Sequence, residues 1–144
     1  MLKPNLAEPN TKSTTKVIVV KTLAQLMQKA GKDVVIGEGS AAAPKYNVIG
    51  IVTYRTKNRQ ILDAMQQYVF DTLGYSEMAK ELNIPLINLH SGEIVEVPLK
   101  NGFVAKSLKI HKSLTEVDLL YSVPMMKTHQ LGTVTLAMKN LKSS

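Results

Sequence analysis

Apolar residues recur along the chain at two different spacings. Residues 16–30 and 61–73 carry them three and four positions apart, which is typical of an amphipathic helix, and residues 78–82 repeat this pattern more briefly. Gly31 and Gly74 follow the first two segments, where glycine commonly ends a helix. The pattern therefore predicts three helices in the first part of the chain.

Short apolar runs precede and follow these helices, and each has the length of a strand. They lie at residues 33–36, 48–54, 84–89 and 118–123. A final helix is expected from Thr133, which can cap its first turn, to about Lys142. Strands that alternate with helices predict an α/β fold with a mostly parallel sheet and helices on both faces.

One segment has the pattern of two antiparallel strands. Residues 93–99 and 103–110 are extended runs on either side of Asn101-Gly102, which favours a hairpin over about residues 93–110 with a two-residue type I′ turn. No internal repeat or linker divides the chain. We therefore expect residues 1–144 to form a single α/β domain.

The amino-acid composition excludes several classes of functional site. With 144 residues, 44% of them hydrophobic, the chain can bury one core. It has no cysteine, which excludes disulfides, thiolate metal sites, iron–sulfur ligation and a cysteine nucleophile, and it leaves the cofactor unknown. The first residues lack the apolar stretch of a signal peptide, and no run approaches the ~20 apolar residues that span a bilayer. We expect a soluble, cytoplasmic protein with no membrane partner.

The net charge of +7 indicates an attraction for anions. The excess consists mostly of lysine, since Arg55 and Arg59 are the two arginines, and aromatic residues make up 5% of the chain. No nucleic-acid-binding motif is present in the sequence. The charge therefore favours a small anionic molecule as the partner, and nucleic acid is the weaker alternative.

The segment from Pro124 to Thr133 has the strongest case for a ligand site. It follows an apolar strand and precedes the expected last helix, and ligands of open α/β sheets bind where strand ends lead into helices. Lys127, Thr128 and His129 offer a cation, a hydroxyl and a titrating ring. Free N–H groups at a helix start near Thr133 would favour carboxylate or phosphate. The alternative is that these are solvated loop residues.

Further polar residues are placed where they can reach the same crevice. Lys139 would lie inside the last helix with its side chain leaning back toward the helix start, or it would simply favour the helix end by its charge. Asn140 either joins the site or ends the helix. The other candidate ligand-binding residues follow predicted or possible strand ends: Lys3, Asn5, Glu38 and Ser40.

Two other features are interpreted as structural. Residues 37–42 fit a loose dinucleotide-binding fingerprint, but Pro44 interrupts the helix that this motif requires. His90 and His111 have no partner at metal-ligand spacing and are expected at the surface. We therefore expect no metal site.

Four segments together resemble the family catalogued as domain of unknown function 362. They are Lys-Pro-Asn at residues 3–5, Gly-Glu-Gly-Ser at 37–40, Val-Pro-Met-Met-Lys-Thr-His at 123–129 and Thr-Leu-Ala-Met-Lys-Asn-Leu at 135–141. The order and spacing of these segments carry the resemblance, which covers nearly the whole chain. It implies that Lys127 and His129 are functional residues.

The chain also departs from the pattern of that family. Members usually have a full strand before the Lys-Pro-Asn motif, continue well beyond residue 141 and often carry ferredoxin-like cysteine motifs, which are absent here. The resemblance thus implies a truncated version of a longer domain. An open first strand could be completed by a second copy, which would give a homodimer.

A more distant similarity is to the nickel-pincer lactate racemase family, which has a comparable order of elements. His129 and Lys139 are ten residues apart, as the similarity would require. It implies a racemase- or isomerase-like enzyme, with His129 as catalytic acid/base and Lys139 as cofactor anchor. The chain thus leaves three functions open: an anion- or cofactor-binding domain, such an enzyme, or a non-catalytic interaction domain for an iron–sulfur redox partner.

Overall fold

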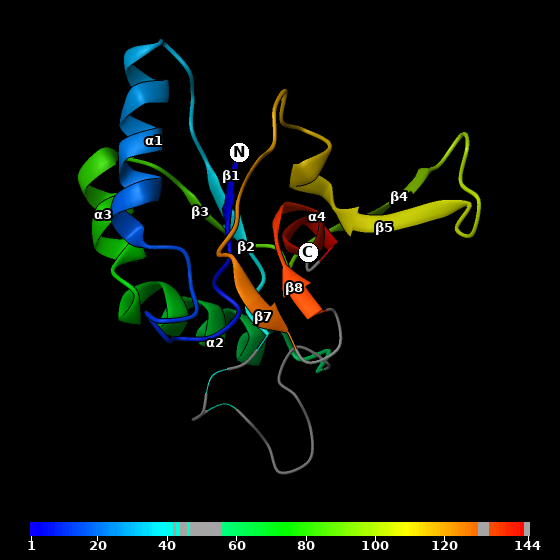
Figure 1. The fold of residues 1–144 in the computed structure, drawn as a ribbon, viewed down its shortest axis with the longest axis horizontal. Coiled ribbons are helices and arrows are strands. Elements are labelled where there is room, and N and C mark those ends of the chain that lie inside the picture. The colour runs from blue at the N-terminus through cyan, green and yellow to red at the C-terminus, as the bar shows by residue number, and fades with distance from the viewer. Residues whose placement is uncertain (42, 44–45, 47–55, 130–132, 143–144) are drawn as a thin grey trace.

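A computed structural model describes residues 1–41, 43, 46, 56–129 and 133–142 (Figure 1). Strands and helices alternate through the first half of the chain, and short strands dominate the second. The elements are β1 (Leu2–Pro4), α1 (Val17–Lys29), β2 (Ile36–Glu38), α2 (Arg59–Thr72), α3 (Tyr75–Leu82), β3 (Leu86–Asn88), β4 (Ile94–Pro98), β5 (Ser107–His111), the 3-10 helix η3 (Lys112–Leu114), β6 (Tyr121–Val123), β7 (Lys127–His129), β8 (Thr133–Thr135) and α4 (Ala137–Lys142).

The main sheet has four parallel strands in the order β3-β2-β1-β6. All three residues of β1 and of β2 are buried, as expected for parallel strands that are covered on both faces. In Figure 1, α1 and α3 lie on one side of this sheet and α4 lies on the other. The predicted fold class, a mostly parallel α/β sheet flanked by helices, is confirmed.

The strand order contains one reversal of direction. The chain proceeds from β1 to β2 to β3 toward one edge, and it later returns to place β6 on the opposite side of β1. The loops that leave β1 and β6 therefore diverge, and open α/β sheets commonly bind ligands at such a reversal, beyond the carboxyl ends of the strands. Pro4 pairs with Val123 at these ends.

The predicted helices are confirmed with small shifts of their ends. Val20 and Ala24 bury one side of α1, and Gly31 follows that helix with a φ of +71°, a conformation that glycine adopts without strain. Asn58 caps α2 by accepting hydrogen bonds from the backbone of the first turn. Side chains of α1, α2 and α3 join β1 and β2 in one hydrophobic core.

The predicted antiparallel hairpin is confirmed as β4 and β5, but the predicted two-residue turn is wrong. Pro98 pairs with Ser107, so residues 99–106 form a longer connection. Gly102 is required there because an added Cβ would lie 1.8 Å from the carbonyl oxygen of Ala105. The glycine thus permits a close backbone approach rather than an Asn-Gly type I′ turn.

Two predictions are wrong: the start of the last helix and the open edge of the first strand. Thr133 does not begin the last helix, because residues 133–135 form β8, which pairs antiparallel with β7, and α4 starts at Ala137. The sequence Thr-Val-Thr is rich in β-branched residues, which favour strands. The first strand is also not open, because β1 pairs with β2 and β6, and this removes the argument for a homodimer.

The expected strand at residues 48–54 lies outside the described residues. Among the helices that the structure does describe, none combines the length and apolarity needed to cross a bilayer.

Candidate functional site

A buried ion pair lies between the carboxyl halves of the two central strands. The ammonium nitrogen of Lys3 in β1 is 3.0 Å from Oε1 of Glu38 in β2, and the side chains are 0% and 3% exposed. Glu38 also accepts backbone hydrogen bonds from Gly39 at 2.8 Å and from Leu6 at 3.2 Å. Because Leu6 and Gly39 belong to the loops after β1 and β2, Glu38 fixes both loops at this edge of the sheet.

The electrostatics of Glu38 reflect this burial. Removal from water raises the pKa of the Glu38 carboxyl above its ordinary value, and the Lys3 ammonium and the two backbone N–H groups oppose that rise. Burial also raises the pKa of the Tyr75 hydroxyl, and the charge of Glu38 adds to the effect. The Tyr75 hydroxyl remains a donor and bonds to the carbonyl oxygen of Thr15 at 3.0 Å.

Thr15 joins the carboxyl ends of β1 and β6. Its hydroxyl accepts a hydrogen bond from the backbone N–H of Asn5 at 2.9 Å and donates one to the carbonyl oxygen of Val123 at 2.6 Å. Its backbone N–H bonds to the carbonyl of Asn5 at 3.0 Å. Thr15 is not among the site residues predicted from the sequence, and it does not cap α1, because Lys16 is the N-cap and no side chain caps that helix.

Asn140 connects α4 to the same place. Its amide nitrogen donates to the carbonyl oxygen of Lys3 at 2.9 Å and to the hydroxyl of Ser122 at 3.0 Å, and its Oδ1 accepts from the amide of Asn5 at 3.3 Å. A carbonyl oxygen can only accept, so the bond to Lys3 fixes the orientation of both amides. The structure buries Asn140 at the carboxyl end of β1 and inside α4 rather than at its last residue, and its role in a ligand site stays a prediction.

In this orientation, the side-chain oxygen of Asn5 receives no hydrogen bond from the part of the chain that the structure describes. Oδ1 of Asn5 is buried and has no hydrogen-bond partner among the described residues. Buried polar atoms are normally paired, so an unpaired acceptor at a strand end requires an explanation. Ligand or water binding would supply the missing donor.

Gln66 of α2 is a second buried amide at this edge, and sequence reasoning did not find it. Its Oε1 accepts from the backbone N–H of Ser40 at 2.7 Å, while its Nε2 has no partner among the described residues. The Ser40 hydroxyl donates to the carbonyl of Leu6 at 2.7 Å. The sequence does contain a signal for Gln66: it is a polar residue among the apolar residues that form the buried side of a predicted helix.

Lys127, from the second half of the chain, contacts the loop that follows β1. Nζ of Lys127, at the start of β7, donates to the carbonyl oxygen of Ser13 at 2.8 Å. Burial lowers the pKa of Lys127, and the nearby charge of Lys139 lowers it further, whereas Glu8 and Glu38 raise it. Lys127 is thus within electrostatic reach of both Lys139 and Glu38. Lys139 is the third residue of α4 rather than about the sixth of a longer helix.

The other predicted residues of the 124–133 segment belong to the β7–β8 hairpin. Thr128 is exposed and pairs with Val134 across that hairpin. The side chains of His129 and Thr133 lie outside the described part of the structure, so the roles predicted for them remain predictions. The helix start that was expected to offer N–H groups near Thr133 is not at that position.

The glycines of residues 37–40 permit close packing. A Cβ on Gly39 would lie 2.5 Å from the ring of His90.

His111 is buried rather than at the surface, with ring contacts to the Ser113 hydroxyl at 2.8 Å and the Ser91 carbonyl at 2.9 Å. Within the described part of the chain, no group of three or more His, Cys, Asp or Glu side chains could hold a metal.

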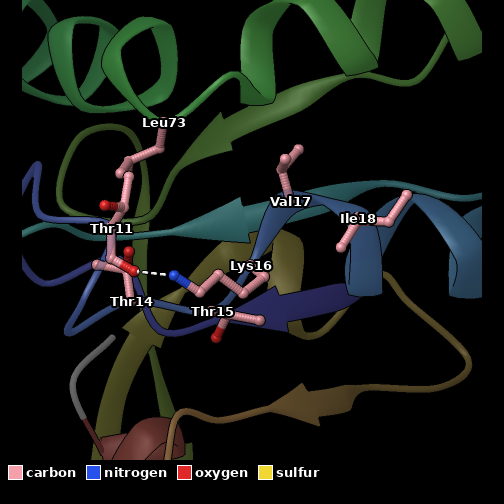
Figure 2. Close-up of a pocket in the computed structure, with 7 residues that line it drawn as sticks. All are labelled: Thr11, Thr14, Thr15, Lys16, Val17, Ile18 and Leu73. Atoms are coloured by element: carbon pink, nitrogen blue, oxygen red, sulfur yellow. Dashed lines mark hydrogen bonds between the residues drawn. The ribbon is translucent and has the colours of Figure 1, made fainter.

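A separate hollow of about 240 Å³ lies at the start of α1 (Figure 2). It shares Thr15 with the polar strand ends, and the rest of its wall comes from residues outside the predicted site. Val17, Ile18 and Leu73 give it apolar surface, and Lys16 turns toward Thr11, whose carbonyl accepts its hydrogen bond. We locate the polar chemistry at the strand ends, because the buried charged and amide groups are there.

The fold and these contacts define an α/β domain with a cluster of buried polar side chains at the carboxyl edge of a parallel sheet. The chain belongs to the family described as Domain of unknown function (DUF362), which it matches over residues 1–144. Thylakoid-associated protein sll1697 of Synechocystis sp. is 24% identical over 144 residues, which cover 98% of this chain and 37% of that protein. No solved structure matches the chain. The resemblance to the family is confirmed, and the similarity to lactate racemases stays a prediction.

Proposed function

We propose that this domain binds a small anion, a carboxylate or a phosphate, at the carboxyl ends of β1 and β6. The observation that carries the proposal is the convergence of cations on this edge: Lys127 is held at Ser13, in the loop that follows β1, and is sensitive to the charge of Lys139. The nearby charge of Lys139 disfavours the charged form of Lys127, and an anion bound between the two side chains would offset this repulsion.

The groups beneath these lysines support a ligand site rather than a purely structural one. A buried ion pair such as Lys3–Glu38 is weak evidence for stability, since its desolvation cost can exceed its Coulomb energy. Perturbed ionisable groups gathered at a strand-end crevice are typical of functional sites. In this proposal Lys127 and Lys139 contact the anion, and Lys3, Glu38 and Asn140 hold the strand ends in place.

Asn5 supports a finer description of the ligand. Its buried Oδ1 can accept one hydrogen bond, so an anion that also carries an O–H or N–H donor would satisfy it. Because the atom is buried, side chains would have to move when such a ligand enters, as is common on binding.

The enzymatic alternative uses His129 as acid/base with Lys139 as cofactor anchor. Both this alternative and the anion-binding proposal use Lys139. They can be distinguished because an enzyme would convert the bound molecule into a product, whereas a binding domain would leave it unchanged. A non-catalytic domain for an iron–sulfur redox partner is the third expectation. We expect the chain to act in the cytoplasm, whereas the name of the relative associates that protein with the thylakoid.

Calorimetric titration of the chain with inorganic phosphate and with acetate tests the proposal. We expect saturable binding of at least one anion, weakened about tenfold by Lys127→Gln and by Lys139→Gln, because a charge-assisted hydrogen bond is lost. Lys100→Gln, an exposed lysine near the tip of the hairpin, is the matched control. Absence of binding, or an equal effect of all three substitutions, would contradict the proposal.

A further inference from the structure

We propose that the outer face of α1 is a docking surface for an anionic lipid membrane. This outer face carries Ile18, Val19 and Leu26 beside the exposed polar residues Thr22 and Gln25, together with the lysines at the two ends of the helix: Lys12, Lys16, Lys29 and Lys32. The inference is independent of the anion site, because none of these residues belongs to it.

The apolar part of the outer face is unexpected for a helix that already buries its other side. Val20 and Ala24 are fully buried against the core, yet Ile18, Val19 and Leu26 are 63%, 46% and 58% exposed. At 3.6 residues per turn, Ile18, Val19 and Leu26 lie on one side of the helix, opposite Val20 and Ala24. A solvent-facing helix side is normally polar, so α1 presents apolar side chains in two directions.

Lysine predominates in the segment that carries this face, and the acidic residues Glu8 and Asp33 lie just outside it. Between Pro9 and Lys32 the chain has five lysines and no aspartate or glutamate. Lys21 is neutralised by Glu81 of α3 at 2.7 Å, and the four remaining lysines are exposed. Two precede or begin the helix and two end or follow it, so cations flank the aliphatic residues along a helix about 20 Å long.

This arrangement fits a membrane surface better than a protein partner. Aliphatic side chains flanked by lysines are typical of helices that lie in the lipid interface, where the apolar residues enter the acyl boundary and the ammonium groups meet anionic headgroups. Protein interfaces are instead enriched in aromatic residues and arginine and depleted of lysine. Attachment of this kind uses no spanning helix, and Figure 1 shows α1 at the periphery of the fold, away from the β4–β5 hairpin.

The hollow at the start of α1 adjoins the outer face through Lys16 and Ile18 (Figure 2). A headgroup at this end of the helix would have the Lys16 ammonium beside it. The ammonium now bonds to the carbonyl of Thr11, a contact that it can exchange for a phosphate oxygen without a change in the backbone.

Co-sedimentation of the 144-residue chain with vesicles tests the proposal. We expect at least about tenfold stronger binding to phosphatidylcholine vesicles that contain phosphatidylglycerol than to phosphatidylcholine alone, and a loss of this preference at high salt. Equal binding to both kinds of vesicle, or binding to neither, would overturn the proposal.

Substitutions locate the contact on the helix. Leu26→Ser should weaken binding to the anionic vesicles several-fold, whereas Phe103→Ser, which changes a 98% exposed residue of the hairpin loop, should not. Replacing Lys29 and Lys32 together by glutamine should weaken binding by about fivefold per lysine, and the same change at exposed Lys100 and Lys109 should have little effect. Because all these side chains are exposed, the fold should persist. Equal losses in the helix and hairpin variants would contradict the assignment to α1.

Discussion

The side-chain amide nitrogen of Asn140 donates a 2.9 Å hydrogen bond to the carbonyl oxygen of Lys3, although 137 positions separate the two residues in the chain. The bond ties a six-residue helix to the central strand of the sheet. So short a helix is not stable by itself in water, so its position depends on tertiary contacts such as this one. The contact also places Lys139, the neighbour of Asn140, at the edge where β1 ends.

Asn140→Ala should therefore destabilise the domain by about 1–3 kcal/mol, because it removes the buried hydrogen bonds that Asn140 makes with the Lys3 carbonyl and the Asn5 amide. Urea unfolding followed by circular dichroism measures the change. Gln67→Ala is the control, since it removes an amide that makes two exposed hydrogen bonds, to Asp71 and Ser76, and should have a much smaller effect. A loss no larger than that of the control would show that Asn140 does not hold α4 in place.

The Lys3–Glu38 pair predicts a stability that depends on pH. Lys3→Met leaves the buried carboxyl of Glu38 without its counter-charge, which should cost about 3–5 kcal/mol where Glu38 is ionised. The pKa of Glu38 is already raised in the folded protein, and this substitution raises it further. The folded state then binds a proton more tightly than the unfolded state, so stability falls as pH rises from the unfolded pKa through the folded one.

Unfolding midpoints of the Lys3→Met variant across a pH series test this expectation. The difference from the unaltered chain should be small at acidic pH and should grow toward neutral pH. Lys21→Met removes a half-exposed partner of Glu81 and should cost less than about 1 kcal/mol at every pH. A loss that is equally large at acidic pH would mean that the packing of the Lys3 side chain, and not the charge of Glu38, sets the cost.

The sequence was sufficient to predict the first three helices and a mostly parallel sheet, because apolar residues recur at helical spacing and in runs of strand length. It could not predict the pairing of β1, since a three-residue strand that is buried on both faces has no alternation to recognise. The Lys3–Glu38 contact was also hidden, because strand register and not sequence spacing brings the two side chains together. Lys3, Asn5, Glu38, Ser40 and Asn140 were nevertheless named as candidates, on strand-end position or family motif.

Thr15 and Gln66 show what the candidate list missed. Each has a polar group whose partner is a backbone group of a distant segment, at Val123 and Ser40 respectively. Local sequence rules give neither residue a role in the site, because such rules weigh only neighbouring residues. The start of the last helix was misplaced for a related reason: the capping preference of Thr133 was outweighed by the β-branched run that pairs with β7.

Lys127 predicts how anion binding should change with pH. Burial lowers the pKa of its ammonium group below the ordinary lysine value, so the group loses its proton at a lower pH than a lysine in water does. A bound anion favours the charged form, and affinity for the anion should therefore fall as pH rises through this lowered pKa. Calorimetric titration at increasing alkaline pH measures the change.

Lys127→Arg is the matched variant for that measurement, since a guanidinium keeps its charge throughout the range. It should retain anion binding with a weaker dependence on pH, provided that the larger head is accommodated. The same pH dependence in both proteins would assign the titration to a different group.

Asn5 leads to a prediction about the choice between two anions of similar shape. Hydrogenphosphate carries an O–H donor near neutral pH and sulfate does not, and the buried Oδ1 of Asn5 lacks a donor among the described residues. We therefore expect phosphate to bind about tenfold more tightly than sulfate. Asn5→Leu should bring the two affinities together, whereas Asn88→Leu, at the end of strand β3, should preserve the difference. Glycolate and acetate form the corresponding pair for a carboxylate site. Equal affinities within both pairs for the unaltered chain would leave anion binding intact and remove Asn5 from the site, while binding of none of the four would contradict the proposed function itself.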